Sequence, residues 1–151
     1  MKILVSACLL GTPCRYDGAS KASAAVIALG DKHTLVPVCP EVLGGLPTPR
    51  PPAERQEDGR TVNRAGADVT AQYQSGARAT LELARKEGCT IAVLKAKSPS
   101  CGRGKIYDGS FSGRLTDGDG AAARYLMDAG IPVLTEDEAE EYFKTWEEKK
   151  T

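Results

Sequence analysis

Three cysteines of this 151-residue chain each follow a stretch that predicts a β-strand. They are Cys8 after the apolar run 3–5, Cys39 directly after the run 34–38, and Cys101 in the loop after the run 90–94. In open parallel sheets, the loops that follow successive strands meet at one edge, and ligands bind there. We therefore expect the three thiols to converge at one end of a sheet, where they could hold a metal centre.

The spacing of these cysteines favours an iron–sulfur cluster over zinc. Structural zinc sites usually take their ligands in close pairs such as Cys-x-x-Cys, and the sequence contains no such pair. Dispersed thiolates suit a cluster, because thiolates from separate loops can bind separate irons. With only three ligands, a four-iron cluster would keep one iron open, and an open iron can bind a substrate.

The other two cysteines and the single histidine are interpreted differently. Cys89 follows the helix-ending Gly88 and starts a strand, so we expect it in the core at the opposite end of the sheet. Cys14 lies close enough to Cys8 to face the same site, either as a further functional thiol and metal ligand or as a structural residue. His33 precedes the second strand, which removes the usual cysteine–histidine nucleophile pair.

Polar residues beside the cysteines could take part in the chemistry. Glu41 would place a carboxylate near the metal, as a general acid or base requires, although a solvated turn residue is the alternative. Ser98 and Ser100 could hold an anion or hydrogen-bond cluster sulfurs, or simply form a turn. For the other charged residues that flank the strand ends we expect surface exposure: Arg15, Asp17, Lys95 and Lys97.

The elements that must position these residues predict an α/β fold. Three of the predicted helices end at a glycine: one capped by Ser20 and ended by Gly30, one capped by Asp68 and ended by Gly88, and one over 120–129 before Gly130. Each is followed by an apolar strand. This alternation predicts three layers, with a mainly parallel, Rossmann-like sheet between helices on both faces. Pro37 cannot donate to a ladder, which favours an edge position for its strand.

The segment 40–67 interrupts this alternation. It is rich in proline, and we expect no helix in it. Asp58 and Gly59 form the dipeptide preferred in tight hairpin turns, so we expect a small β-ribbon from 54–56 and 60–62. Long stretches of this kind often form a lid or a binding loop. We expect the glycine-rich stretch 105–118 to be a loop, and a last helix to start from a capping box of Thr135 and Glu138.

Composition limits the remaining choices. A length of 151 residues is typical of one domain, so we expect residues 1–151 to form a single domain with 40–67 inserted. The formal net charge is zero, which gives no signature of nucleic-acid binding. An odd number of cysteines argues against a disulfide framework and favours a cytoplasmic location. No stretch approaches the roughly 20 apolar residues of a membrane span. The oligomeric state stays open.

The residues around the cysteines resemble a known family. The matching motifs are 6–11 (SACLLG), 14–18 (CRYDG), 37–41 (PVCPE) and 98–102 (SPSCG). These motifs, in this order, resemble the thiouracil desulfurase family, small bacterial proteins long catalogued as domain-of-unknown-function family 523. The resemblance extends over nearly the whole chain and implies an iron–sulfur enzyme.

The resemblance implies a 4Fe-4S cluster held by Cys8, Cys39 and Cys101. Its open iron would capture the sulfur of a thiolated pyrimidine such as 2-thiouracil, and the carbon–sulfur bond would be hydrolysed without net redox change. Glu41 would activate water or shuttle a proton, and Ser98 and Ser100 would position the substrate or the cluster. The substrate could be a free thiobase, a thionucleoside or another thioamide.

Two other classes of function stay open from the sequence. One is a thiol–disulfide or persulfide enzyme in which Cys8 and Cys14 are the attacking and resolving thiols, which requires a depressed pKa. The other is a cluster-bearing sensor or binding module that holds a small ligand without turnover.

Overall fold

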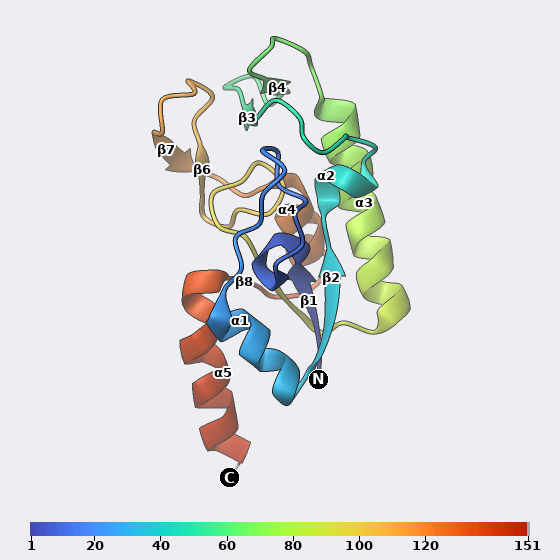
Figure 1. Cartoon of the computed structure of the whole chain (residues 1–151), viewed down its shortest axis with the longest axis vertical. Coiled ribbons are helices and arrows are strands. Elements are labelled where there is room, and N and C mark those ends of the chain that lie inside the picture. Colours follow the sequence, from blue (N-terminus) through green and yellow to red (C-terminus); the bar gives the residue numbers. More distant parts are fainter. Residues whose placement is uncertain (151) are drawn as a thin grey trace.

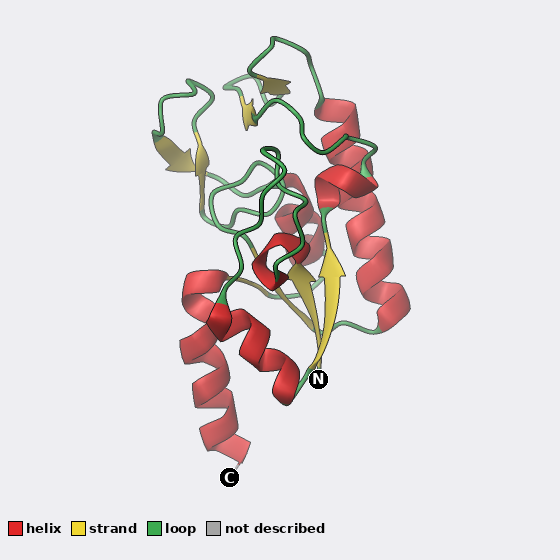
Figure 2. Ribbon diagram, in the orientation of Figure 1, coloured by secondary structure: helices red, strands yellow, loops and turns green. Residues whose placement is uncertain are grey.

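A four-stranded parallel sheet forms the centre of the molecule. In the computed structural model, which describes residues 1–150, its strand order is β2-β1-β5-β8. The strands are β1 (Lys2–Ser6), β2 (Thr34–Val38), β5 (Ile91–Leu94) and β8 (Val133–Thr135). All three neighbouring pairs are parallel, which confirms the predicted sheet. Their carboxyl ends point toward the end of the molecule that carries the small ribbons (Figures 1 and 2).

Helices cover both faces of this sheet, as predicted (Figure 1). Ile3 and Val5 of β1 pack with Phe143 on one face, whereas Leu4 packs with Leu126 on the other, because successive side chains of a strand point to opposite sides. The helices are α1 (Ala24–Ala28), α2 (Pro40–Leu43), α3 (Thr70–Glu87), α4 (Ala121–Asp128) and α5 (Glu136–Lys150), with 3-10 turns η1 (Ala7–Leu10) and η2 (Leu29–Asp31). None of these helices has the length and apolar character needed to cross a bilayer.

Two helix starts differ from the sequence prediction. Ser20 does not cap α1; Ser23 does, and its hydroxyl accepts the N–H of Val26 at 3.3 Å. The helix starts later because the backbone N–H groups of Lys21 and Ser23 donate to the carbonyls of η1, which holds the chain against that turn. α3 starts at Thr70, so Asp68 lies one residue before the N-cap position, although its carboxylate accepts the Thr70 N–H.

The segments outside the sheet contain more regular structure than expected. The ribbon exists, as β3 (Ala53–Arg55) and β4 (Thr61–Asn63), and each strand is displaced by one residue from its predicted bounds. The expectation of no helix in 40–67 is wrong, because Pro40 occupies the first position of α2. The expected loop 105–118 contains an antiparallel hairpin of β6 (Lys105–Tyr107) and β7 (Leu115–Asp117). These elements have only three or four residues, too few to show a periodic pattern.

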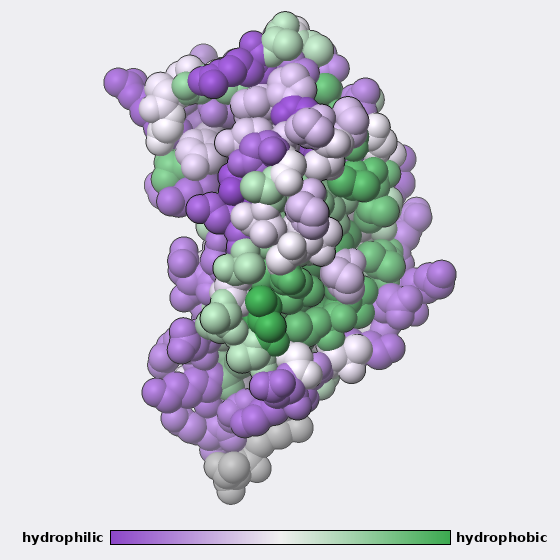
Figure 3. Space-filling view, in the orientation of Figure 1, coloured by the Kyte–Doolittle hydropathy of each residue, from purple (hydrophilic) through white to green (hydrophobic). Residues whose placement is uncertain are grey.

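The strand β2 lies at the edge of the sheet, as Pro37 predicted. Apolar side chains gather around this edge on the face shown in Figure 3, and the exposed side chains of Ile27, Val42 and Leu43 flank it. Pro37 has no N–H to offer, so this edge is a poor template for pairing with another strand.

The helix α2 lies directly against α3 through two glycines. A Cβ atom at Gly76 would lie 2.0 Å from the carbonyl oxygen of Pro40, and one at Gly44 would lie 2.1 Å from the carbonyl oxygen of Gln72. Real Cβ atoms do not approach backbone atoms so closely. The two glycines therefore set the position of α2, and with it the positions of Cys39 and Glu41.

We expect Gly76→Ala to lower the free energy of unfolding by about 1–3 kcal/mol, because the added methyl group overpacks the contact with α2. Chemical denaturation measures this loss. Ser75→Ala is the matched control, since Ser75 is exposed on the same helix and should be nearly neutral. A stability of Gly76→Ala equal to that of the control would show that α2 can shift away at little cost.

The carboxylate half of the predicted capping box is present at the start of α5. The carboxylate of Glu138 accepts the N–H of Thr135 at 3.0 Å and its hydroxyl at 3.2 Å, and it also pairs with Arg103 at 2.9 Å. The backbone hydrogen bond, followed by the charge of Arg103, lowers the pKa of Glu138 below its usual value. The ionised carboxylate therefore stabilises the folded chain.

We expect Glu138→Ala to cost about 1 kcal/mol of stability at pH 7. Because the folded pKa is depressed, this contribution is present above the ordinary carboxyl pKa of about 4.3 and is lost as the pH falls through the lower folded value. Urea denaturation of both proteins at several pH values tests this, with the exposed Glu141→Ala as control. A difference that persists fully in strong acid would contradict the assignment.

Candidate metal and substrate site

The three cysteines predicted to converge line one pocket at the carboxyl end of the sheet. Cys8 lies in η1 after β1, Cys39 separates β2 from α2, and Cys101 lies in the loop after β5. The pocket has a volume of about 340 Å³, and Cys14 also lines it. The structure therefore brings together four thiols from three strand-end segments.

Cys89 and His33 lie away from the pocket, as expected from the sequence. Cys89 is buried in the core cluster that contains Leu4 and Leu126, and it does not line the pocket. His33 packs beside the rings of Phe143 and Trp146, at ring-centroid distances of 5.2 and 5.1 Å, and contributes nothing to the pocket wall.

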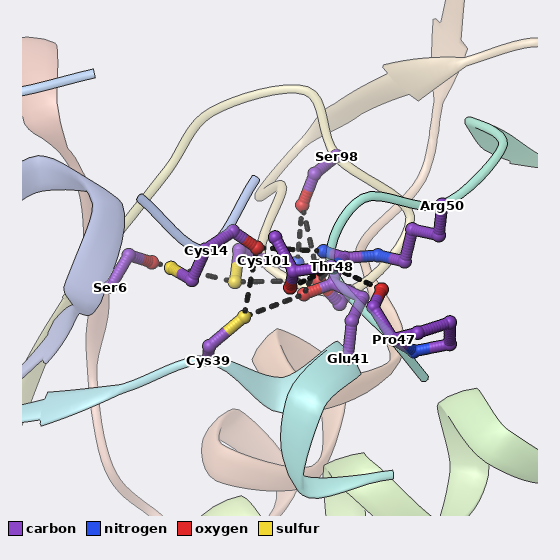
Figure 4. Close-up of polar contacts among 10 residues, drawn as sticks. Ser6, Cys14, Cys39, Glu41, Pro47, Thr48, Arg50, Ser98 and Cys101 are labelled. Carbon is purple, nitrogen blue, oxygen red and sulfur yellow. Dashed lines mark hydrogen bonds and ion pairs between the residues drawn. The ribbon is translucent and has the colours of Figure 1, made fainter. Parts of the chain in front are cut away.

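Glu41 lies at the centre of a polar network in this pocket (Figure 4). Its side chain is buried, and its Oε2 accepts the thiol of Cys39 at 3.6 Å. Its Oε1 accepts a short hydrogen bond from the hydroxyl of Ser100. The hydroxyl of Ser98 lies 3.3 Å from that of Ser100. The two serines and the carboxylate named from the sequence thus form one hydrogen-bonded group.

Arg50 is a member of this network that the sequence did not indicate. Its Nη2 lies 3.9 Å from Oε2 of Glu41 and donates to the carbonyl oxygen of Cys14 at 3.1 Å. Its side chain is only 7% exposed. The positive charge of the buried guanidinium compensates the negative charge of the buried Glu41 carboxylate. Arg50 therefore contacts both Glu41 and the loop that carries Cys14. The residue comes from the proline-rich segment, which offered no pattern to single it out.

Cys101 is the most enclosed of the three thiols. Its sulfur accepts a hydrogen bond from the hydroxyl of Ser6 at 3.4 Å, and its N–H donates to the hydroxyl oxygen of Ser98 at 2.7 Å. The hydroxyl oxygen of Ser100, whose proton goes to Glu41, lies 3.5 Å from the same sulfur. Ser6, at the end of β1, was not named as a site residue; it also accepts the N–H of Lys95 at 2.9 Å. Hydroxyl donors to a cysteine sulfur stabilise the thiolate form that ligates metals.

The loop that carries Cys101 has no room to move. A Cβ atom at Gly120 would lie 2.4 Å from the carbonyl carbon of Ser100, and one at Gly102 would lie 2.7 Å from the carbonyl oxygen of Ser98. The start of α4 therefore presses against this turn and fixes the direction of its side chains.

Burial raises the pKa values of all four thiols in the pocket. The pKa of Cys8 rises to about 11 and that of Cys39 to about 12, with burial the main cause; the charge of Glu41 adds to the second. The pKa values of Cys14 and Cys101 are raised for the same reason. At neutral pH these groups are thiols in the metal-free chain, and thiols are poor nucleophiles.

The donor set fits an iron–sulfur cluster. Within residues 1–150, no three Cys, His, Asp or Glu side chains lie close enough to surround one metal ion. A cluster places each thiolate on a different iron, so its ligands stand farther apart than those of a single ion. Three thiols from separate loops around one pocket, with a hydroxyl donor to one of the sulfurs, match that requirement.

The charged residues near the strand ends fall into two pairs. Asp17 and Lys97 are exposed, as expected. Arg15 and Lys95 are not: both are half-buried and line the pocket, and Lys95 pairs with Glu136 at 2.8 Å. The expectation of exposure is wrong for Arg15 and Lys95, because the loops at the carboxyl end of the sheet enclose them. Other lining residues that the sequence did not single out are Tyr16, Arg50, Glu54, Arg64, Tyr73, Tyr107 and Phe111.

Comparisons with known proteins agree with this geometry. The chain is 48% identical to a solved structure described as a 4Fe-4S-dependent thiouracil desulfidase, TudS, with a TM-score of 0.88 over 97% of each chain. It is also 44% identical over 145 residues to the uncharacterized protein YbbK of Bacillus subtilis (strain 168), and the matched region covers 90% of this chain and 96% of YbbK. The model of the 2-thiouracil desulfurase family matches residues 3–138. The chain therefore belongs to the 2-thiouracil desulfurase family.

Proposed function

We propose that this protein is a 4Fe-4S-dependent enzyme that hydrolyses the carbon–sulfur bond of a thiolated pyrimidine such as 2-thiouracil. The observation that carries the proposal is the convergence of three thiols and a buried carboxylate in one pocket of a member of this family. In the overall reaction, water replaces sulfide on the ring carbon, giving uracil and hydrogen sulfide. No electron is gained or lost.

Cys8, Cys39 and Cys101 would hold the cluster. When bound, the cluster supplies a Lewis-acidic iron, which polarises a thiocarbonyl group as metal ions polarise carbonyls. The hydroxyl of Ser6 donates to the sulfur of Cys101 and favours its thiolate. Cys14 lines the same pocket, but its sulfur is not needed to complete a three-cysteine set.

Glu41 is the group that we assign to proton transfer. Its carboxylate takes a proton from the attacking water and can return it to the leaving sulfur, as a general acid–base group does. Ser100 and Arg50 each contact one of its oxygens, which fixes the direction of the carboxylate. Ser98 lines the pocket beside them and would hydrogen-bond the substrate ring.

The pocket supports a small substrate. Its volume of about 340 Å³ lies near the lower end of the range of roughly 300–1,000 Å³ typical of small-molecule sites, and cluster and substrate must share it. We infer a thiobase or thionucleoside rather than a polynucleotide, consistent with a formal net charge of zero. All five cysteines are free, which supports a cytoplasmic location.

Residues 40–67 would be an insertion in a single domain, and residues of this segment help to enclose the site.

The thiol–disulfide alternative is not favoured by the site. That chemistry needs a thiol with a depressed pKa, whereas burial raises the pKa values of Cys8 and Cys14.

The test of the proposed function is anaerobic reconstitution with iron and sulfide, followed by incubation with 2-thiouracil. We expect a visible absorption band of an iron–sulfur cluster and release of uracil and sulfide in equal amounts, without an added oxidant or reductant. A protein that stays iron-free after reconstitution would contradict the cluster, and an iron-loaded protein that leaves 2-thiouracil intact would contradict the activity.

A further inference from the structure

The tip of the β6–β7 hairpin places an aromatic ring in the pocket wall. Phe111 lies in this tip, is half-buried and lines the pocket. Its backbone has a φ of +55°, in the left-handed region that non-glycine residues adopt at a cost of about 1–2 kcal/mol. A strained residue persists only where its surroundings hold it, and such residues concentrate at binding sites.

A buried carboxylate holds this strained tip. Glu54 of β3 is 8% exposed, and its Oε1 accepts the backbone N–H groups of Gly109 at 3.0 Å and Phe111 at 3.1 Å. Burying a carboxylate costs free energy unless hydrogen bonds compensate it. The two backbone N–H groups supply these hydrogen bonds only in this conformation of the loop. Gln56 donates to the carbonyl oxygen of Gly109 at 3.3 Å, and a Cβ atom at Gly109 would lie 2.7 Å from the carbonyl oxygen of Arg55.

A second planar group accompanies the ring. The Cζ atom of Arg64 lies 5.6 Å from the centroid of the Phe111 ring, and its Nη2 donates to the carbonyl oxygen of Phe111 at 3.3 Å. Arg64 lines the same pocket and is exposed, whereas its partner ring is half-buried. Aromatic rings and guanidinium planes are the groups on which proteins stack nucleobases.

We propose that the Arg64–Phe111 pair is the stacking platform for the planar ring of the substrate, and that Glu54 is the positioning residue that holds it over the cysteine pocket. This inference rests on the proposed function, since it assumes that the ligand is a pyrimidine. A ring stacked on this platform shares the pocket with the three cysteines and Glu41, which lets the platform orient the thiocarbonyl group. Neither the platform nor Glu54 needs to touch the metal.

The test of the platform is calorimetric binding of uracil, which lacks the reacting sulfur, to the reconstituted protein. Phe111→Ala should raise the Kd by roughly fivefold to a hundredfold, since stacking contributes ~1–3 kcal/mol per base. Phe111→Tyr should bind like the parent protein. Leu115→Ala is the matched control, because Leu115 is a large exposed side chain on the same hairpin that does not line the pocket. Iron content should be unchanged in all three, and Phe111→Ala should raise KM for 2-thiouracil more than it lowers kcat.

The test of Glu54 compares two substitutions of similar size. Glu54→Gln keeps an acceptor oxygen, whereas Glu54→Met removes it and leaves both amide groups without a partner. Hydrogen exchange at Gly109 and Phe111 should accelerate by about fivefold or more in Glu54→Met and much less in Glu54→Gln, with unchanged exchange in β1 and β5. The Kd for uracil should rise in the same order. Faster exchange of the loop with an unchanged Kd would overturn the positioning role.

The two levels of the proposal fail differently. Uracil binding by Phe111→Ala as tight as that of the parent would overturn the platform while leaving desulfuration intact. A parent protein that is loaded with iron, yet neither binds uracil nor releases sulfide from 2-thiouracil, would overturn the proposed function together with the platform.

Discussion

Cys101→Ala is expected to leave a folded protein that retains almost no iron after reconstitution and releases no detectable sulfide from 2-thiouracil. Cys101 is the most enclosed of the three proposed ligands, and its sulfur accepts a hydrogen bond from the hydroxyl of Ser6. Loss of a residue that only hydrogen-bonds a metal ligand lowers the metal affinity roughly 10–100-fold, so loss of a ligand itself should lower it further. Iron content, visible absorption and sulfide release measure the effect, and circular dichroism checks the fold. Cys8→Ala and Cys39→Ala should behave in the same way.

Cys89→Ala is the matched control for these substitutions. It removes the same atoms from a buried site at the opposite end of the sheet, so iron content and activity should stay near those of the parent. Cys14→Ala separates the remaining alternatives: full activity would remove the dithiol mechanism and show that three cysteines suffice. If Cys101→Ala bound as much iron as Cys89→Ala, the ligand assignment would be wrong.

Glu41→Gln should reduce the rate of sulfide release by about 10²–10⁴-fold, the usual contribution of a general acid–base group. Glutamine has nearly the same size and keeps an oxygen that can accept the Ser100 hydroxyl, so the loop should stay in place. It cannot take a proton from water. We therefore expect unchanged iron content and nearly unchanged binding of uracil, with the loss confined to kcat.

The control for this substitution is Glu57→Gln, an exposed glutamate in the same inserted segment. It makes the same chemical change outside the pocket and should be neutral. A Glu41→Gln protein with a rate within a few-fold of this control would show that another group, or water alone, moves the proton. A loss of iron in Glu41→Gln would instead assign the carboxylate a role in holding the metal site.

The site has a division of labour that follows from its construction. The loops that follow β1, β2 and β5 supply the thiols, while residues of the two small ribbons also line the pocket. Figure 1 shows both ribbons beyond the carboxyl ends of the strands. Arg50 and Glu54 tie the segment 40–67 to other parts of the pocket, the first through the carbonyl oxygen of Cys14 and the second through the hairpin tip.

The sequence by itself determined the parallel sheet, the order of the helices and the end of the sheet at which the three cysteines lie. These features depend on local signals: apolar runs, helix-ending glycines, a proline that cannot donate, and a capping box, each of which acts within a few residues. The placement of thiols at strand ends then followed from the geometry of parallel sheets. Cys89 and His33 were placed away from the site by the same argument.

Only the tertiary structure decided which polar residues meet. Arg50 reaches the loop of Cys14, Ser6 reaches Cys101 and Glu54 reaches Phe111 because loops far apart in the sequence pack over the carboxyl end of the sheet. The short elements α2, β6 and β7 and the burial of Lys95 escaped prediction for the same reason. Such contacts depend on long-range packing and on close backbone approaches at glycines, and neither leaves a periodic pattern in the sequence.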